Sequence, residues 1–167
     1  AFPSSAEALS GPPDAGEPPN PAGGNSLRPR LHVPAKQQQA ELQAHGLRAQ
    51  SHVVMAPGAE YGPAKRWPVS HFAALAAALS QDVVLLGSSK ERALCDEIVA
   101  QAQPGKTRGR LLNLAGQTSL AQAFALIASA HRMVSNDSGL MHVAAALEVP
   151  QVAVFGSSSP EHTPPLS

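Results

Sequence analysis

A polar turn followed at once by an Ala-rich helix is the part of this chain best suited to chemistry. Asp137, Ser138 and Gly139 follow the apolar pair Met133-Val134, and the helix is expected to begin at Gly139. Ser138 or Asp137 can cap this helix, and Gly139 lets a ligand approach the backbone closely. The N–H groups and the positive dipole end of a helix start favour an anion. The turn therefore predicts a phosphate or diphosphate site.

Two side chains beside this turn have both a structural and a binding interpretation. Asp137 can cap the helix, and its carboxylate can also accept hydrogen bonds from sugar hydroxyls. His142 lies one turn into the helix and can reach a phosphate, although a histidine on an Ala-rich helix is often a packed structural residue. The residues alone leave both alternatives open.

A second polar segment, residues 57–68, reads PGAEYGPAKRWP. Lys65 offers a compact positive charge to a phosphate group, and the surrounding glycines and prolines restrict the path of the chain. The alternative is that Lys65 and Arg66 are solvated surface charges. Trp67 is expected to anchor the start of the next helix rather than to stack on a base.

These segments must be positioned by a regular alternation of strands and helices. Short aliphatic runs separated by segments of helix length indicate βαβ units, a Rossmann-like α/β fold and a parallel sheet with helices on both faces. The small-residue loops follow the strands, at the edge where open α/β sheets bind ligands. The expected strands are His52–Ala56, Asp82–Leu86, Leu111–Leu114, Arg132–Ser135 and Gln151–Phe155, and the expected helices are Val69–Ser80, Lys90–Gln103, Ser119–Ala130 and Gly139–Leu147.

The N-terminal part differs in composition from the rest of the chain. Residues 1–34 hold eight of the 16 prolines and little aliphatic periodicity, so they are expected to lack regular structure and to pack little. A short helix is expected over Ala35–Leu47, and the folded core is expected to begin at Ser51. This divides the chain into a Pro-rich linker with a short helix, residues 1–50, and a nucleotide-binding domain, residues 51–167.

Composition excludes several classes of protein. The 12 basic and 12 acidic side chains balance, which argues against a nucleic-acid binder. Cys95 is the only cysteine, so no intrachain disulfide can form and a reducing compartment is favoured. The longest apolar run, Phe72–Leu79, is too short to cross a bilayer. The seven histidines are scattered, with no metal-binding spacing, so neither a metal nor another cofactor is expected.

The blocks over residues 57–68 and 135–147 resemble the donor-binding half of bacterial heptosyltransferases of glycosyltransferase family 9. The resemblance extends over about residues 51–167 and implies the C-terminal domain of a two-domain GT-B fold, truncated at its C-terminus. It implies inverting transfer of L-glycero-D-manno-heptose from ADP-heptose to the first heptose of the lipopolysaccharide inner core. The general base and the pocket for the lipid A-core acceptor would lie in an N-terminal domain outside this chain. Because the chain starts with Ala1 rather than Met, we expect a fragment of a longer protein. Without that N-terminal domain, the fragment is not expected to turn over alone.

The same resemblance implies a role for particular residues. It places Asp137 and His142 at the sugar-phosphate end of the donor, Thr118 near the adenine and Glu91 near the ribose. It also implies a metal-independent cytoplasmic enzyme with at most peripheral association with the inner membrane. The residues implied to contact the diphosphate are Gly58, Ala59, Lys65, Ser138 and Gly139.

Other nucleotide-binding functions remain as alternatives. A dinucleotide-dependent oxidoreductase is disfavoured, because Gly-x-Gly-x-x-Gly does not follow the first strand. A non-catalytic nucleotide-binding module, or another GT-B enzyme that uses a nucleotide sugar, would have the same strand and loop pattern.

Overall fold

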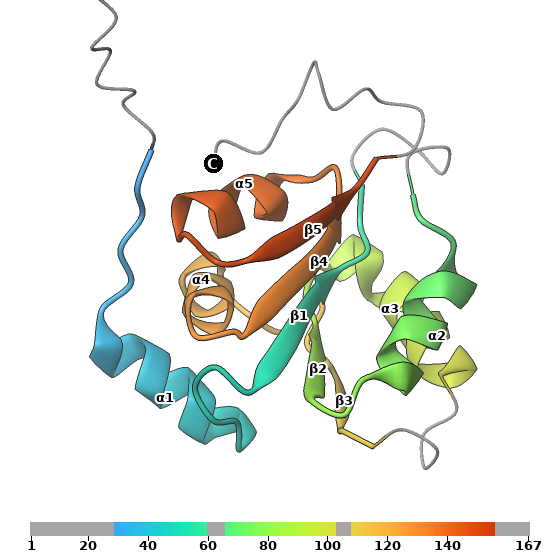
Figure 1. Cartoon of the computed structure of the whole chain (residues 1–167), viewed down its shortest axis with the longest axis horizontal. Coiled ribbons are helices and arrows are strands. Elements are labelled where there is room, and N and C mark those ends of the chain that lie inside the picture. Colours follow the sequence, from blue (N-terminus) through green and yellow to red (C-terminus); the bar gives the residue numbers. More distant parts are fainter. Residues whose placement is uncertain (1–28, 60–65, 103–107, 156–167) are drawn as a thin grey trace, which may run out of the picture.

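The computed structural model describes residues 29–59, 66–102 and 108–155, which contain a five-stranded sheet (Figure 1). All strand pairs are parallel, and the order is β3-β2-β1-β4-β5. The predicted α/β class and parallel sheet are therefore confirmed. The strands are β1 (His52–Ala56), β2 (Asp82–Leu85), β3 (Leu111–Asn113), β4 (Arg132–Asn136) and β5 (Gln151–Val154).

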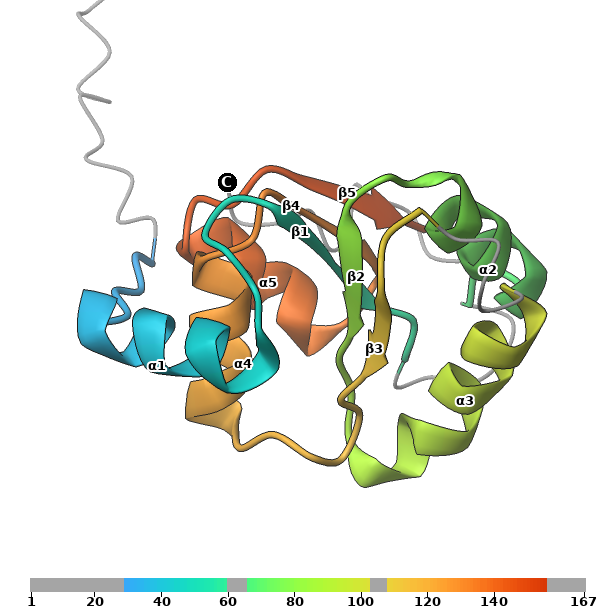
Figure 2. The same cartoon turned by 90° about the horizontal axis from the view of Figure 1, so that it is seen from below.

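The helices cover both faces of this sheet (Figures 1 and 2). They are α1 (Ala35–His45), α2 (Val69–Ala78), the 3₁₀ helix η2 (Ser89–Glu91), α3 (Arg92–Gln101), α4 (Leu120–Ala128) and α5 (Gly139–Ala146). Strand ends differ from the predicted ones by at most one residue and helix ends by at most two. The type of helix differs at one position: the helix predicted from Lys90 begins as the 3₁₀ helix η2, and the α-helix α3 starts at Arg92.

Side chains of β1 alternate between two apolar layers, because successive residues of a strand point to opposite faces. Val53 and Met55 pack with Phe72 of α2 and with Ile98 of α3. Val54 and Ala56 pack in the other layer, which holds the buried residues of α1, α4 and α5. All five residues of β1 are buried, as expected for the central strand of a covered parallel sheet.

The core begins earlier in the chain than the predicted Ser51. Leu42 of α1 and Leu47 just after it are buried in the same layer as α4. Of the segment expected to lack regular structure, residues 1–28 lie outside the described part, and residues 29–34 contain neither helix nor strand. Within residues 29–34, Val33 is buried, and the Leu31 N–H donates to the Ala146 carbonyl oxygen at 2.8 Å. This short segment therefore packs more than its composition suggested.

Ser119 caps α4, since its Oγ accepts from the Gln122 N–H at 3.2 Å while the Gln122 side chain accepts from the Ser119 N–H at 2.8 Å. Cys95 is buried in α3, and this burial, reinforced by the nearby carboxylates of Glu91 and Asp96, raises the pKa of its thiol to about 12. No helix in the described ranges has the length and apolar character needed to span a bilayer.

Candidate functional site

A cavity of about 540 Å³ opens at the carboxyl ends of the strands. It is bordered by the loops after β1, β2 and β3 and by the turn between β4 and α5. This is the edge at which open α/β sheets bind ligands. Six of the nine predicted site residues line it: Gly58, Ala59, Glu91, Thr118, Ser138 and Gly139.

Glu91 supplies the carboxylate of this cavity, at the end of η2. Its Oε2 accepts hydrogen bonds from the Ser88 N–H at 2.6 Å and from the Ser88 hydroxyl at 3.0 Å. The carboxylate lies in space left by two glycines: a Cβ on Gly58 would overlap it, and a Cβ on Gly87 would stand 2.8 Å from Oε2. A half-buried carboxylate held in this way can accept further hydrogen bonds from hydroxyl groups of a ligand.

Another part of the cavity wall is apolar. Leu120 and Phe124 of α4 and Leu140 and Val143 of α5 line it together. Leu120 is 66% exposed, although it is a large apolar side chain at the start of a helix. The pairing of an apolar wall with a few placed polar groups is typical of small-molecule sites. Such a wall can bind the flat face of a nucleotide base.

Ser138 occupies the N-cap position of α5, yet its side chain makes no capping hydrogen bond. Its Oγ is buried and has no hydrogen-bond partner among the described residues. A buried hydroxyl without a partner is unfavourable, so a ligand that bonds to it is stabilised. Ser138 was one of the two predicted caps of α5, with Asp137, and its hydroxyl is instead available to a ligand beside Gly139 at the helix start, where N–H groups favour an anion.

The other predicted residues are placed less directly. Asp137 and His142 are half-buried beside this turn, and neither lines the cavity. The Nδ1 atom of His142 is buried without a hydrogen-bond partner in the described part of the chain. Lys65 lies outside the described residues.

Sequence reasoning missed one residue that organises the site. Asn136, the last residue of β4, is fully buried and bonds through its side chain to Pro57 and Trp67 of the loop after β1. A buried amide at the end of an apolar strand was the available signal, but its partners are 69 and 79 residues away in sequence.

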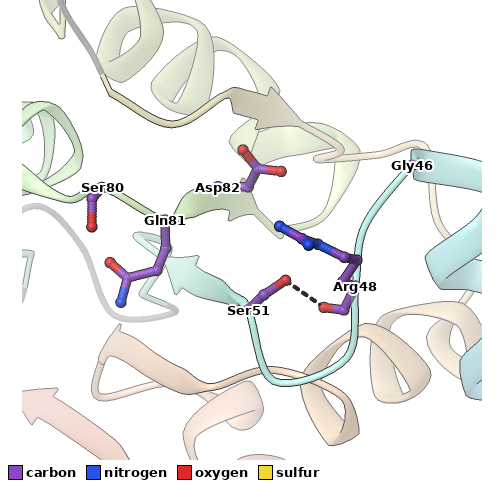
Figure 3. A pocket seen from close by; sticks show the side chains of 6 residues that line it. All are labelled: Gly46, Arg48, Ser51, Ser80, Gln81 and Asp82. Carbon is purple, nitrogen blue, oxygen red and sulfur yellow. Dashed lines mark hydrogen bonds between the residues drawn. The ribbon is translucent and has the colours of Figure 1, made fainter.

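A second hollow, of about 360 Å³, lies at the amino ends of β1 and β2 (Figure 3). Two of its lining side chains have partners: Ser51 Oγ donates to the Arg48 carbonyl oxygen at 2.7 Å, and Arg110 donates to the Asp82 carboxylate at 2.7 Å. The hydrogen bonds from Arg110 lower the pKa of Asp82 below its ordinary value. These contacts connect structural elements, and we assign no ligand to this hollow.

The described residues contain no group of three or more side chains that could hold a metal ion. Metal independence stays a prediction, because residues 1–28, 60–65, 103–107 and 156–167 lie outside the described ranges.

A Rossmann-like sheet with a cavity at its carboxyl edge is typical of the class of nucleotide-binding α/β domains. The family model for glycosyltransferase family 9, the heptosyltransferases, matches residues 23–167. The chain belongs to this family.

The chain is similar to several characterised members. It is 54% identical over 114 residues to lipopolysaccharide heptosyltransferase 2 of Salmonella typhimurium, covering 66% of this chain and 32% of that protein. The solved structure of E. coli ADP-heptose LPS heptosyltransferase II matches with a TM-score of 0.77 and 46% identity, over 83% of this chain and 43% of that one. E. coli heptosyltransferase WaaC with ADP-2-deoxy-2-fluoro heptose matches with a TM-score of 0.55 and 25% identity, over 74% and 38%. The chain thus spans 32–43% of the length of these relatives, and the activity of a whole enzyme is a proposal for it.

Proposed function

We propose that this chain is the donor-binding part of an inverting heptosyltransferase that uses ADP-heptose. The diphosphate would bind at the start of α5, where Ser138 and Gly139 line the cavity, with Gly58 and Ala59 on the neighbouring loop. Glu91 would accept hydrogen bonds from the ribose hydroxyls, and the backbone at Thr118 would lie near the adenine. The similarity to WaaC, whose solved structure contains an ADP-heptose analogue, supports this choice of ligand.

In this proposal, binding also favours the departure of ADP. Negative charge grows on the diphosphate as the bond to the sugar breaks, and preorganised N–H groups and cations stabilise that charge. The start of α5 would supply the N–H groups and Lys65 the cation. Asp137 and His142 would act at the sugar-phosphate end. No metal or other cofactor is required in this scheme.

The acceptor would be the first heptose of the lipid A-core. Its pocket and the general base would lie in an N-terminal domain outside this chain. We infer a cytoplasmic reaction with at most peripheral association with the inner membrane, since the donor is a nucleotide sugar and the acceptor is a lipid-linked saccharide. No nucleic acid is involved.

The observation that carries the proposal is the buried, unbonded Ser138 hydroxyl at a helix start, in the same cavity as the Glu91 carboxylate. Calorimetric titration of residues 1–167 with ADP, UDP and NAD tests it. ADP should bind, and Lys65→Ala should weaken binding by about 2–4 kcal/mol if the lysine neutralises the diphosphate. Lys36→Ala, on the exposed surface of α1, is the matched control and should bind like the wild type.

Two results would count against this function. Tighter binding of NAD than of ADP would favour a dinucleotide site, and equal affinity for ADP and UDP would remove the preference for adenine. If Lys65→Ala binds ADP as tightly as the wild type, Lys65 is a solvated surface charge and not a diphosphate contact.

A further inference from the structure

The Asn136 side chain bridges the two ends of the loop between β1 and α2. Its Nδ2 donates to the Pro57 carbonyl oxygen at 2.7 Å, and its Oδ1 accepts from the Trp67 N–H at 2.9 Å. Pro57 directly follows β1, and Trp67 stands two residues before α2. One amide therefore satisfies one backbone group at each end of the loop.

This bridge begins where the ladder between β1 and β4 ends. Ala56 pairs with Ser135 as the last residues in register, and Asn136 pairs on its other side with Val154 of β5. Beyond that point, the side chain of Asn136 continues the connection to the segment after β1. The bond between Asn136 and Pro57 is buried, and the bond from the Trp67 N–H is partly buried. Because the Asn136 side chain is fully buried, a lost partner would leave a buried polar group unsatisfied.

The two segments joined in this way both border the cavity. Gly58 and Ala59 come directly after Pro57, and Ser138 comes two residues after Asn136. Asn136 does not line the cavity itself. If β1 shifted relative to β4 at this end, Gly58, which makes room for Glu91, would move relative to the start of α5.

We infer that Asn136 is a positioning residue, which sets the loop after β1 relative to the start of α5 and thereby maintains the nucleotide site without touching the nucleotide. The inference rests on the proposed function for its choice of ligand. The amide supplies one donor and one acceptor at the two positions where they are needed, whereas an ionised aspartate has no donor for the Pro57 carbonyl oxygen and alanine has neither donor nor acceptor.

The test compares Asn136→Asp and Asn136→Ala with a matched control, Asn113→Ala, in residues 1–167. Asn113 also ends a strand and also bonds through its side chain, to Asp96 at 2.6 Å and to the Ala115 N–H at 3.0 Å, but it lies outside the cavity. The measurements are ADP affinity by calorimetry, amide signals and hydrogen exchange by NMR without ligand, and thermal stability.

Both Asn136 variants should move the amide signals of Gly58 and Ala59 and weaken ADP binding about tenfold, the scale of one buried hydrogen bond left unmade. The Trp67 amide should stay protected from exchange in Asn136→Asp, whose carboxylate still accepts its hydrogen bond, and lose protection in Asn136→Ala. Asn113→Ala should keep the wild-type ADP affinity and the wild-type Gly58 and Ala59 signals, even where its stability falls.

Unchanged Gly58 and Ala59 signals in folded Asn136→Asp, or an ADP affinity within about twofold of the wild type, would overturn the inference. If Asn136→Ala does not fold, the isosteric Asn136→Asp variant decides. A wild-type chain that binds no ADP would refute the proposed function instead, and the ligand-free amide measurements would still decide whether Asn136 sets the two loops.

Discussion

Glu91 and Gly58 show how two residues far apart in sequence define one feature of the cavity. The carboxylate of Glu91 is held by Ser88, and it occupies the place where any other residue at position 58 would have its Cβ. The resemblance to heptosyltransferases suggested Gly58 as a phosphate contact. The structure gives a second, independent reason for a glycine at position 58: a side chain there would occupy the space of the Glu91 carboxylate.

Replacing Gly58 by Ala should therefore weaken ADP binding through Glu91. The new methyl group would push the carboxylate away from the Ser88 N–H, and a charged hydrogen bond of this kind contributes about 1.5–3 kcal/mol. A double-mutant cycle in calorimetry measures the effect: Gly58→Ala combined with Glu91→Ala should lose little more affinity than Glu91→Ala alone. Additive losses would show that the added methyl group obstructs the ligand directly.

The resemblance to heptosyltransferases implied six of the residues that line the cavity, and the parallel sheet explains why they meet, because it brings the loops after its strands to one edge. Sequence analysis could not identify Asn136, since its role depends on which strands are neighbours, and the order of strands is not written in any local pattern. Nor could it show that Ser138 leaves its hydroxyl unbonded, because a serine at a helix start normally caps.

At the scale of elements, Arg110 connects three parts of the fold. Its side chain donates to the Asp82 carboxylate of β2 at 2.7 Å, and to the carbonyl oxygens of His45 and Gly46 at 3.2 and 2.7 Å. The last two bonds satisfy the C-terminal end of α1, where Gly46 adopts a left-handed φ of 61°. Arg110 precedes β3, so one side chain ties α1, β2 and β3 together.

The Arg110–Asp82 pair should contribute stability that depends on pH. The hydrogen bonds from Arg110 hold the pKa of Asp82 below its ordinary 3.8, so its contribution is full above that value and is lost as the pH falls through the lowered pKa. The expected loss in Asp82→Asn is about 1 kcal/mol at neutral pH, because the arginine is half-exposed and solvent screens the pair. Urea unfolding from pH 7 to pH 2 should show this difference shrinking only below about pH 4.

Arg110→Lys provides a second measurement of the same connection. Lysine keeps the charge but lacks the planar fork that reaches both the carboxylate and the end of α1, so about 1 kcal/mol should again be lost. Arg108→Lys, two residues earlier and exposed, is the control and should unfold like the wild type. Equal stability of all three proteins would show that the bonds to α1 contribute nothing.

Most of the helices and strands could be predicted from the sequence. Aliphatic runs and helix-length spacers placed all five strands, since buried parallel strands have near-continuous apolar residues. The tertiary role of α1 was missed because its Gln-rich sequence has little apolar character, and only Leu42 and the following Leu47 reach the core. The burial of these two leucines against the layer of α4 is not indicated by any periodic apolar pattern in the sequence of α1.

At the scale of the whole molecule, residues 1–167 should bind ADP and transfer no heptose. A GT-B reaction requires two domains, and the proposed acceptor pocket and general base belong to the other one. Base assistance alone commonly contributes about 10²–10⁴ in rate, and acceptor positioning contributes more. Product assays with a heptose-I core acceptor should stay blank, beside a full-length heptosyltransferase as the positive control. Heptosyl transfer by the purified chain would refute the assignment of the base to a second domain.

The central place of β1 in the sheet has a consequence for synthesis on the ribosome. β1, β2 and β3 occupy one continuous stretch, residues 52–113, and can pair as they emerge. The other edge of β1 must wait for β4, which begins at Arg132. Until then Val53–Ala56 present an apolar strand with unpaired backbone groups, which is the kind of edge that recruits other chains. The nascent chain thus keeps an edge that can misassociate, and that a chaperone can shield, until β4 has been synthesised.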